Sequence, residues 1–306
     1  MSNRQPTSLV KFCDASTAAH ILTDSTLRWS APCLFGDPFE LNHHSSLNFD
    51  SRKLLSACVK STMGLIFSRD DPKGSSPLIK AIRRWRTEER FDSEDEAQEV
   101  LSELLTTMVQ HREPEILQLM TDWRRYSRSL RILCMSEKHD QIGLWERYAG
   151  NHSGIAIRFA CGEDTSLENP QAVRYQETKP EITSLTEQMD ILMNQAAILE
   201  ETDFSEKFLS KSKLELKDRE WRLLREVEDS EEVIDESRMY EDLPFEDNEV
   251  RAIYFGAVVD PKVKQDISAL AQRKYGKAKL FQAQPHTARF ELEFQRIDAS
   301  GMPIDQ

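Results

Sequence analysis

Short strand-like segments are scattered along this sequence without a regular β-α-β alternation, which predicts an α+β fold and not a doubly wound parallel sheet. In the clearest segment, Ile155, Ile157 and Phe159 alternate as on one side of a half-buried strand. Other strands are expected at 8–12, 26–30, 131–136, 173–175, 219–227, 250–255, 277–282 and 289–295, and helices at 15–22, 141–149, 181–208 and 261–275. The predicted fold class is α+β with a mixed or antiparallel β core.

Residues 51–128 have helical periodicity instead. Apolar residues from Leu101 to Val109 recur at i, i+3, i+4, i+7 and i+8, the stripe of an amphipathic helix. We therefore expect a single α+β domain over 1–306, with 51–128 as an inserted helical block packed on the sheet. Residues 226–249 are dense in Asp and Glu and are expected to form a mobile acidic loop.

Composition narrows the possible partners and the compartment. The net charge of −13 disfavours generic nucleic-acid binding, because a phosphate backbone is repelled by such a surface. Apolar runs are far shorter than the ~20 residues of a membrane-spanning helix, and no secretory signal is recognisable. The five cysteines include no C-x-x-C pair, which favours a reducing, cytoplasmic location and disfavours a disulfide framework.

Several catalytic motifs are missing from the sequence. It has no P-loop, no G-x-G-x-x-G, no H-E-x-x-H and no G-x-S-x-G, which disfavours the corresponding nucleotide, redox, protease and hydrolase chemistries. His43 and His44 form the only histidine pair, without a matching cysteine or aspartate cluster. No metal is therefore expected.

Short motifs in a fixed order carry a family resemblance. They are KF at 11–12, WSAP at 29–32, FGDPFE at 35–40, LCMSE at 133–137, LWERYA at 144–149, NHSG at 151–154, EWRL at 220–223 and IYFG at 253–256. In these motifs the chain resembles a bacterial family catalogued as domain of unknown function 2971. That family usually has asparagine where this chain has Gly36.

The order of elements is similar to that of ADP-ribosyltransferases of the DNA-modifying toxin type. The resemblance implies a split sheet of that kind, NAD as the substrate, and a toxin or phage-defence setting. It implies three catalytic residues, namely Lys11, Tyr148 and Glu220. It implies that NAD is bound by Lys11, Phe12, Asp37, Phe39, Trp145 and Arg222, with 37–40 as a loop over the nicotinamide.

The chemistry of these residue types fits that assignment. Breaking the nicotinamide–ribose bond develops oxocarbenium charge, which a fixed carboxylate stabilises. On a strand, Glu220 and Arg222 share one face, so the arginine helps to keep the glutamate ionised. Trp145 and Tyr148 are i, i+3 neighbours on a helix, so both rings are expected to line one pocket.

Each feature also has a purely structural explanation. Trp145 and Tyr148 fit the buried face of a small helix, and Glu220 with Arg222 fits a surface salt bridge. We expect an NAD-utilising ADP-ribosyltransferase-like enzyme that transfers to an unknown acceptor macromolecule or hydrolyses NAD. The alternative is a non-catalytic interaction or regulatory protein that docks through 51–128 and 226–249. A Mg²⁺-dependent nuclease is the weakest reading, because the acidic segment is irregular.

Overall fold

The structure is a computed structural model that describes residues 5–37, 39, 41, 47–194, 203–228 and 239–304. The chain divides into two compact units. The sheet unit comprises 1–42, 127–179 and 208–306, and the helical unit comprises 43–126 and 180–207. The sequence predicted one domain with 51–128 inserted, whereas the structure groups most of that block with 180–207 in a unit of its own.

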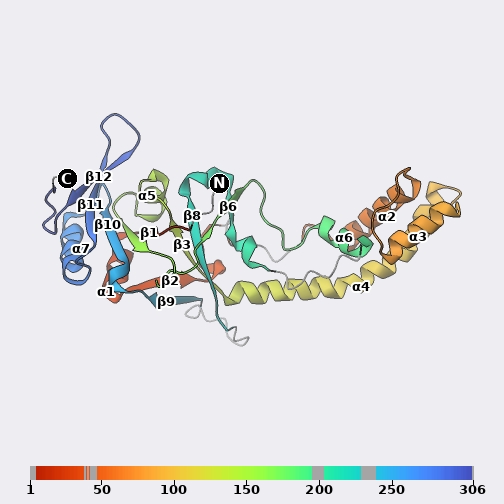
Figure 1. Ribbon diagram of the computed structural model, residues 1–306, viewed down its shortest axis with the longest axis horizontal. Helices are drawn as coiled ribbons and strands as arrows, with labels where there is room; N and C mark the ends of the chain where they lie inside the picture. Colours follow the sequence, from red (N-terminus) through yellow and green to blue (C-terminus); the bar gives the residue numbers. More distant parts are fainter. Residues whose placement is uncertain are drawn as a thin grey trace. The chain divides into compact units, whose positions relative to one another are not determined.

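Within the described residues, the sheet unit contains a ten-stranded sheet of mixed orientation (Figure 1). Its strands are β1 (Ser8–Cys13), β2 (Thr26–Ser30), β3 (Leu130–Ser136), β4 (Ile155–Ala160), β5 (Gln171–Ala172), β8 (Glu220–Glu226), β9 (Tyr240–Pro244), β10 (Val250–Phe255), β11 (Lys279–Pro285) and β12 (Leu292–Ile297). The order is β12-β11-β10-β4-β1-β3-β2-β9, and β8 pairs with β3 and β5. Strands β10 and β11 run parallel, and β10 with β4 antiparallel. The predicted α+β class with a mixed sheet is confirmed.

Side chains that alternate along the strands build a core on each face of this sheet. The helices of the unit are α1 (Ala15–Asp24), α5 (Ile142–Tyr148) and α7 (Pro261–Lys274), with short 3₁₀ turns η1 (Pro32–Leu34), η3 (Lys213–Asp218) and η5 (Asp247–Glu249). In β10, Ile253 and Phe255 join the cluster that contains residues of α1 and α7. Ala252 and Tyr254 join the cluster that contains residues of α5. The period of two therefore places helices on both faces.

Two further details of the sheet unit bear on the sequence predictions. The carboxylate of Asp14 accepts a hydrogen bond from the Thr17 amide at 2.8 Å and so caps the N-terminus of α1, the helix predicted at 15–22. A second, two-stranded parallel sheet pairs β6 (Arg174–Gln176) with β7 (Ser210–Ser212).

Part of the expected acidic loop is ordered as an edge strand. Strand β9 pairs antiparallel with β2, and Arg28 donates to the Asp242 carboxylate at 2.8 Å across that pair. The sequence prediction missed this strand because two of its five residues are exposed and the other three are only partly buried, so its side chains need not be apolar. Residues 229–238 lie outside the described residues.

The helical unit contains long amphipathic helices. They are α2 (Ser51–Phe67), α3 (Pro77–Thr87), α4 (Glu94–Ser129, whose last residues belong to the sheet unit) and α6 (Leu185–Asn194). On α4 the predicted stripe is buried at Leu101 and Leu105. Of the helix predicted at 181–208, the described residues contain α6 and the 3₁₀ turn η2 (Ser205–Leu209), and residues 195–202 lie outside the described residues. No helix in the described ranges is long and apolar enough to cross a membrane.

Candidate functional site

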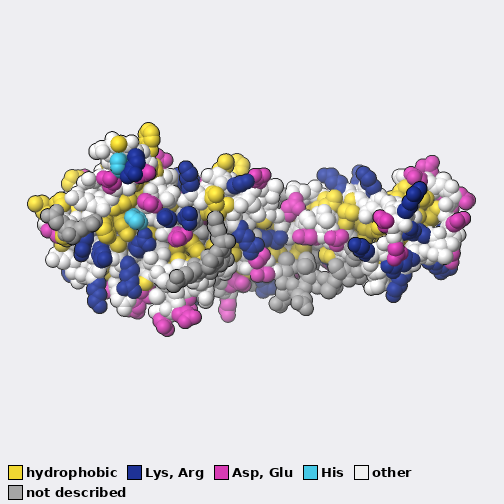
Figure 2. Space-filling model, turned by 45° about the horizontal axis from the view of Figure 1, so that its top comes forward, with side chains coloured by type: hydrophobic (Ala, Val, Ile, Leu, Met, Phe, Trp, Pro, Cys, Tyr) yellow, Lys and Arg dark blue, Asp and Glu magenta, His cyan; other side chains and the backbone are white. Residues whose placement is uncertain are grey.

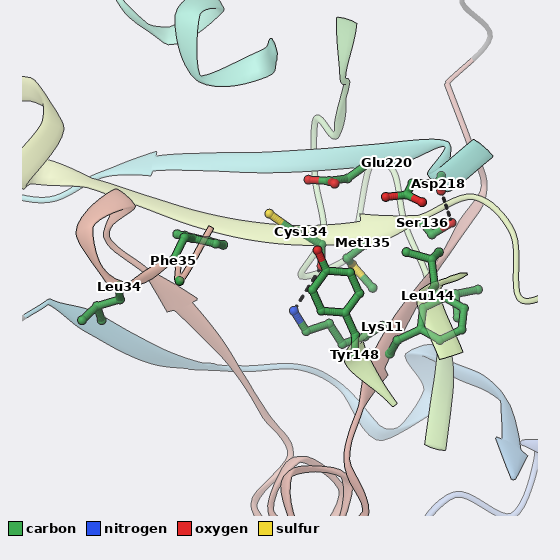
Figure 3. Close-up of a pocket in the computed structure, with 13 residues that line it drawn as sticks. Lys11, Leu34, Phe35, Cys134, Met135, Ser136, Leu144, Tyr148, Asp218 and Glu220 are labelled. Atoms are coloured by element: carbon green, nitrogen blue, oxygen red, sulfur yellow. Dashed lines mark hydrogen bonds between the residues drawn. The ribbon is translucent and has the colours of Figure 1, made fainter. Parts of the chain in front are cut away.

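A cavity of about 290 Å³ lies in the sheet unit, where segments distant in sequence meet (Figure 3). Its walls come from β1, from η1 and the residues after it, from β3, from α5, and from the junction of η3 with β8. The lining residues are Val10, Lys11, Phe12, Leu34, Phe35, Gly36, Cys134, Met135, Ser136, Leu144, Tyr148, Asp218 and Glu220. We call it the fork cavity.

The fork cavity lies where two strands separate. Strands β1 and β3 are antiparallel, and their register consists of the single pair Val10 and Ser136. Beyond that pair β3 continues along β8 over its whole length, while β1 continues along β4. The Lys11 ammonium reaches across the opening and donates to the Cys134 carbonyl oxygen at 3.1 Å. The two strands therefore diverge at this point within one sheet, and the Lys11 ammonium spans the opening between them.

Glu220 opens β8 and is buried at the wall of the cavity. Its Oε1 accepts from Nε of Arg222 at 2.7 Å, and its Oε2 accepts from Nζ of Lys211 at 2.6 Å. Both cationic side chains are almost fully buried, Arg222 at 0% exposure and Lys211 at 1%. Two short charge-assisted hydrogen bonds from buried cations hold the carboxylate of Glu220 in place.

The two cations respond differently to burial. Burial lowers the pKa of the Arg222 guanidinium to about 9, which still leaves it charged at neutral pH. Burial alone would also lower the pKa of the Lys211 ammonium, but the surrounding acids Glu220 and Asp218 outweigh it, so this pKa is raised. Both partners of Glu220 therefore carry a positive charge at pH 7.

Asp218 provides a second buried acid at the junction of η3 and β8. Its carboxylate accepts from Lys211 at 3.1 Å and from Nη2 of Arg147 at 2.6 Å. Arg147 also pairs with Glu215, and the Asp218 carbonyl accepts from the Ser136 hydroxyl at 2.7 Å. This ion network fastens α5, which carries Arg147, to the strand that carries the catalytic candidate.

Charge around the cavity is nearly balanced. The three acids of the network, Glu215, Asp218 and Glu220, are matched by Lys211, Arg222 and Arg147. Among the described residues, the Lys11 ammonium has a carbonyl but no acid as partner. The lining thus presents one cation that is not neutralised.

Tyr148 and Cys134 complete the reactive candidates of the lining. Tyr148 lines the cavity, and the charges of Lys211 and Glu220 act on its hydroxyl. Burial raises the pKa of the Tyr148 phenol, so it stays protonated. Burial, followed by the charge of Glu220, raises the pKa of the Cys134 thiol far above its usual range. Cys134 is therefore a neutral thiol and not an activated nucleophile.

Trp145 does not share the cavity with Tyr148, in contrast to the sequence prediction. Its side chain is fully buried, its Nε1 donates to the His139 carbonyl at 2.8 Å, and its ring lies edge-on to Phe12 at 5.4 Å. The short helix α5 presses this face onto the sheet and leaves Tyr148 half-exposed. Tyr148 therefore lines the fork cavity as predicted. Trp145 does not line it and instead supports the cavity wall through its contact with Phe12.

Three other predicted NAD-binding residues also lie outside the lining. Arg222 is behind Glu220, and its pairing with that acid is a buried ion pair instead of the surface salt bridge considered from the sequence. Asp37 accepts from the Phe39 amide at 2.8 Å, a local turn interaction. Phe39 is 74% exposed, with the Lys179 ammonium 5.0 Å from its ring. Residues 38 and 40 of the expected loop lie outside the described residues.

The fork cavity brings together four of the predicted site residues, namely Lys11, Phe12, Tyr148 and Glu220. The sequence did not predict that Lys211 would bind Glu220. Lys211 sits on β7, in a polar segment with three lysines, and no local pattern distinguishes it from its neighbours. The sequence does indicate that a charged cluster exists here, because Asp218, Glu220 and Arg222 are spaced at i, i+2, which predicts side chains on a common side. It does not indicate that Lys211 joins this cluster.

Within the described ranges, no group of three or more His, Cys, Asp or Glu side chains is arranged to hold a metal ion. No protein-family model, curated protein or solved structure matches the chain. The geometry of the fork cavity and the sequence motifs are therefore the grounds for a functional proposal.

Proposed function

We propose that the protein binds NAD with its nicotinamide riboside end in the fork cavity and cleaves the bond between nicotinamide and ribose. The ADP-ribosyl group would pass to an acceptor macromolecule or to water. The observation that carries this proposal is the carboxylate of Glu220, buried at a cavity wall and hydrogen-bonded by the buried cations Lys211 and Arg222. The split between β1 and β3 supports the ADP-ribosyltransferase-like assignment.

The size of the cavity limits how much of NAD it encloses. Ligand pockets typically measure roughly 300–1,000 Å³. The fork cavity, at about 290 Å³, is at the small end, so it suits the nicotinamide riboside half and leaves the adenosine half at the mouth. Tyr148 lines the cavity with a half-exposed ring, which can pack against the nicotinamide ring.

The reaction then uses groups already in place. The carbon–nitrogen bond breaks with its electron pair leaving on nicotinamide, and positive charge develops on the ribose. The carboxylate of Glu220 stabilises that charge through the ribose hydroxyls, without changing its own protonation state. An acceptor oxygen or nitrogen forms the new bond to ribose and releases its proton to solvent. Lys11, the cation without an acid partner, would hold a phosphate of the substrate.

The direct test measures release of nicotinamide from NAD labelled in its nicotinamide carbonyl. The wild-type chain should release label, and Glu220→Gln should slow release by about 10²–10³-fold, the usual effect of losing one transition-state electrostatic group. The matched control is Glu226→Gln, at the exposed end of the same strand, which should release nicotinamide at the wild-type rate. Thermal unfolding of both variants separates loss of chemistry from loss of the fold.

A non-catalytic nucleotide-binding protein is the second candidate, and the ion network favours it. Both carboxylate oxygens of Glu220 already bond buried cations, which weakens their pull on a developing positive charge. Binding of NAD by calorimetry without any release of nicotinamide would select this reading. Loss of that binding in Lys11→Met would assign it to the fork cavity. If NAD is not bound and nicotinamide is not released, both candidates are ruled out.

A further inference from the structure

A second, larger cavity of about 710 Å³ lies elsewhere in the sheet unit. It is bounded by the start of α5, by the turn before β4, by the residues after β10 and by the connection from β11 to β12. That connection projects beyond the end of the sheet, and hydrophobic, basic and histidine side chains gather on the lobe it forms (Figures 1 and 2). We call this the hairpin cavity, and none of its lining residues lines the fork cavity.

His152 is held at the wall of the hairpin cavity in an uncommon backbone conformation. Its φ is 67°, and the preceding Asn151 has φ 51°, both in the left-handed region, which asparagine and histidine adopt more often than most residues other than glycine. The His152 carbonyl accepts from the Val258 amide at 3.0 Å. A Cβ on Gly256 would stand 2.1 Å from that carbonyl oxygen, so the turn also requires a glycine beneath it.

One nitrogen of the His152 imidazole lacks a hydrogen-bond partner within the described part of the chain. Its Nδ1 is buried and has no hydrogen-bond partner among the described residues. A buried N–H without an acceptor is rarer than a bare acceptor, so the neutral ring is expected to keep its proton on Nε2. An uncommon backbone conformation and an unpaired buried nitrogen at the same residue point to a functional reason for the position of this ring. Nε2–H is then the donor available to a ligand.

The rest of the lining indicates which ligand would fit. The ring plane of His152 is parallel to that of Trp145 within 6°. The rim carries exposed apolar surface, with Phe290 at 101% exposure and Val258 at 65%. Such surface gains most from an aromatic ligand, whose flat faces can pack against the lining rings of His152 and Phe290.

The projecting connection has a defined shape and offers a cation. His286 Nδ1 accepts from the amides of Ala288 and Arg289 at 2.9 and 3.1 Å, which fixes this part of the loop. Arg289 pairs with Glu291 at 3.2 Å, and both side chains are about 60% exposed. An ion pair that exposed is weak, so a ligand carboxylate can compete for the guanidinium at little cost.

We propose that the hairpin cavity is a second ligand-binding site, which takes a flat aromatic molecule carrying a hydrogen-bond-accepting group such as a carboxylate. His152 donates to that group or packs on the ring, Phe290 covers the ring, and Arg289 pairs with the carboxylate. This site is independent of the function proposed for the fork cavity.

The probe for this proposal is indole-3-acetate, titrated into the full chain by isothermal calorimetry. It should bind more tightly than 3-methylindole, which lacks the acceptor, and more tightly than cyclohexylacetate, which is not flat. His152→Asn should weaken binding by about tenfold or more, the loss of one good contact. Asparagine tolerates the left-handed backbone, so this variant keeps the turn. Exposed His20→Ala on α1 is the matched control and should bind as the wild type does.

Phe290→Ser and Arg289→Gln change exposed side chains, so they report even if His152→Asn does not fold. Each should weaken binding, while Glu220→Gln in the fork cavity should not. The proposal is overturned by absence of indole-3-acetate binding, by equal binding of cyclohexylacetate, or by wild-type affinity in all three hairpin-cavity variants. Loss of binding in Glu220→Gln alone would equally overturn it, because the ligand would then occupy the fork cavity.

Discussion

Replacing Lys211 by methionine removes the cation that joins both buried acids of the fork cavity. Its ammonium lies 2.6 Å from Glu220 and 3.1 Å from Asp218, and its side chain is 1% exposed. Breaking a buried ion pair typically costs about 3–5 kcal/mol of unfolding free energy. We take the lower end, about 3 kcal/mol, because Glu220 keeps Arg222 and Asp218 keeps Arg147.

The temperature and pH dependence of this loss can be worked out in advance. For a unit of this size, each kcal/mol lowers Tm by roughly 2–4 °C, so Lys211→Met should lower it by about 6–12 °C. The pKa of Lys211 is raised in the folded protein above its ordinary value of 10.5. Its stabilising contribution is therefore fully present below pH 10.5 and is lost only as the pH rises above that value.

Urea unfolding followed by circular dichroism provides the measurement, and hydrogen exchange of β3 and β8 assigns the transition to the sheet unit. The deficit of Lys211→Met relative to wild type should stay constant from pH 7 to pH 8, where Arg222, whose pKa is lowered to about 9, still carries its charge. It should shrink in acid, where the acids deprived of their cation can take up a proton. Exposed Lys213, paired with exposed Glu177, gives the matched control Lys213→Met, with a loss below about 1 kcal/mol. Equal losses in the two variants would refute the reasoning.

Three further predictions follow from the same coordinates. Gly256→Ala should destabilise the protein by about 1–3 kcal/mol, because its Cβ would meet the His152 carbonyl, whereas Gly36→Ala, with nothing within 4 Å, should leave Tm nearly unchanged. Trp145→Ala should cost about 3–5 kcal/mol in urea unfolding, as expected for a fully buried indole, and a smaller loss would contradict the packing described. Burial, with a neighbouring guanidinium, lowers the pKa of His139 to about 4, so its NMR signals should titrate near that pH. The stability that this neutral histidine provides should be present above pH 6.5 and decline as the pH falls towards 4.

Part of the candidate site was accessible from the sequence. Lys11, Tyr148 and Glu220 were selected through a motif resemblance, and the structure lines one cavity with all three. Trp145 was assigned to the same pocket because i, i+3 spacing puts two rings on nearby faces of a helix. That spacing does not reveal which of the two faces meets the sheet, and here Trp145 does.

Local periodicity by itself determined the strands and helices, since alternation along β4 and the stripe on α4 depend only on neighbours in the chain. Tertiary structure alone decided that the acidic run contains β9, because that strand is stabilised by pairing with distant β2. It also decided that Lys211 meets Glu220, through the pairings of β7 with β6 and of β8 with β3. Contacts of this kind join residues that no short-range pattern relates, because pairing energies act across space and not along the sequence.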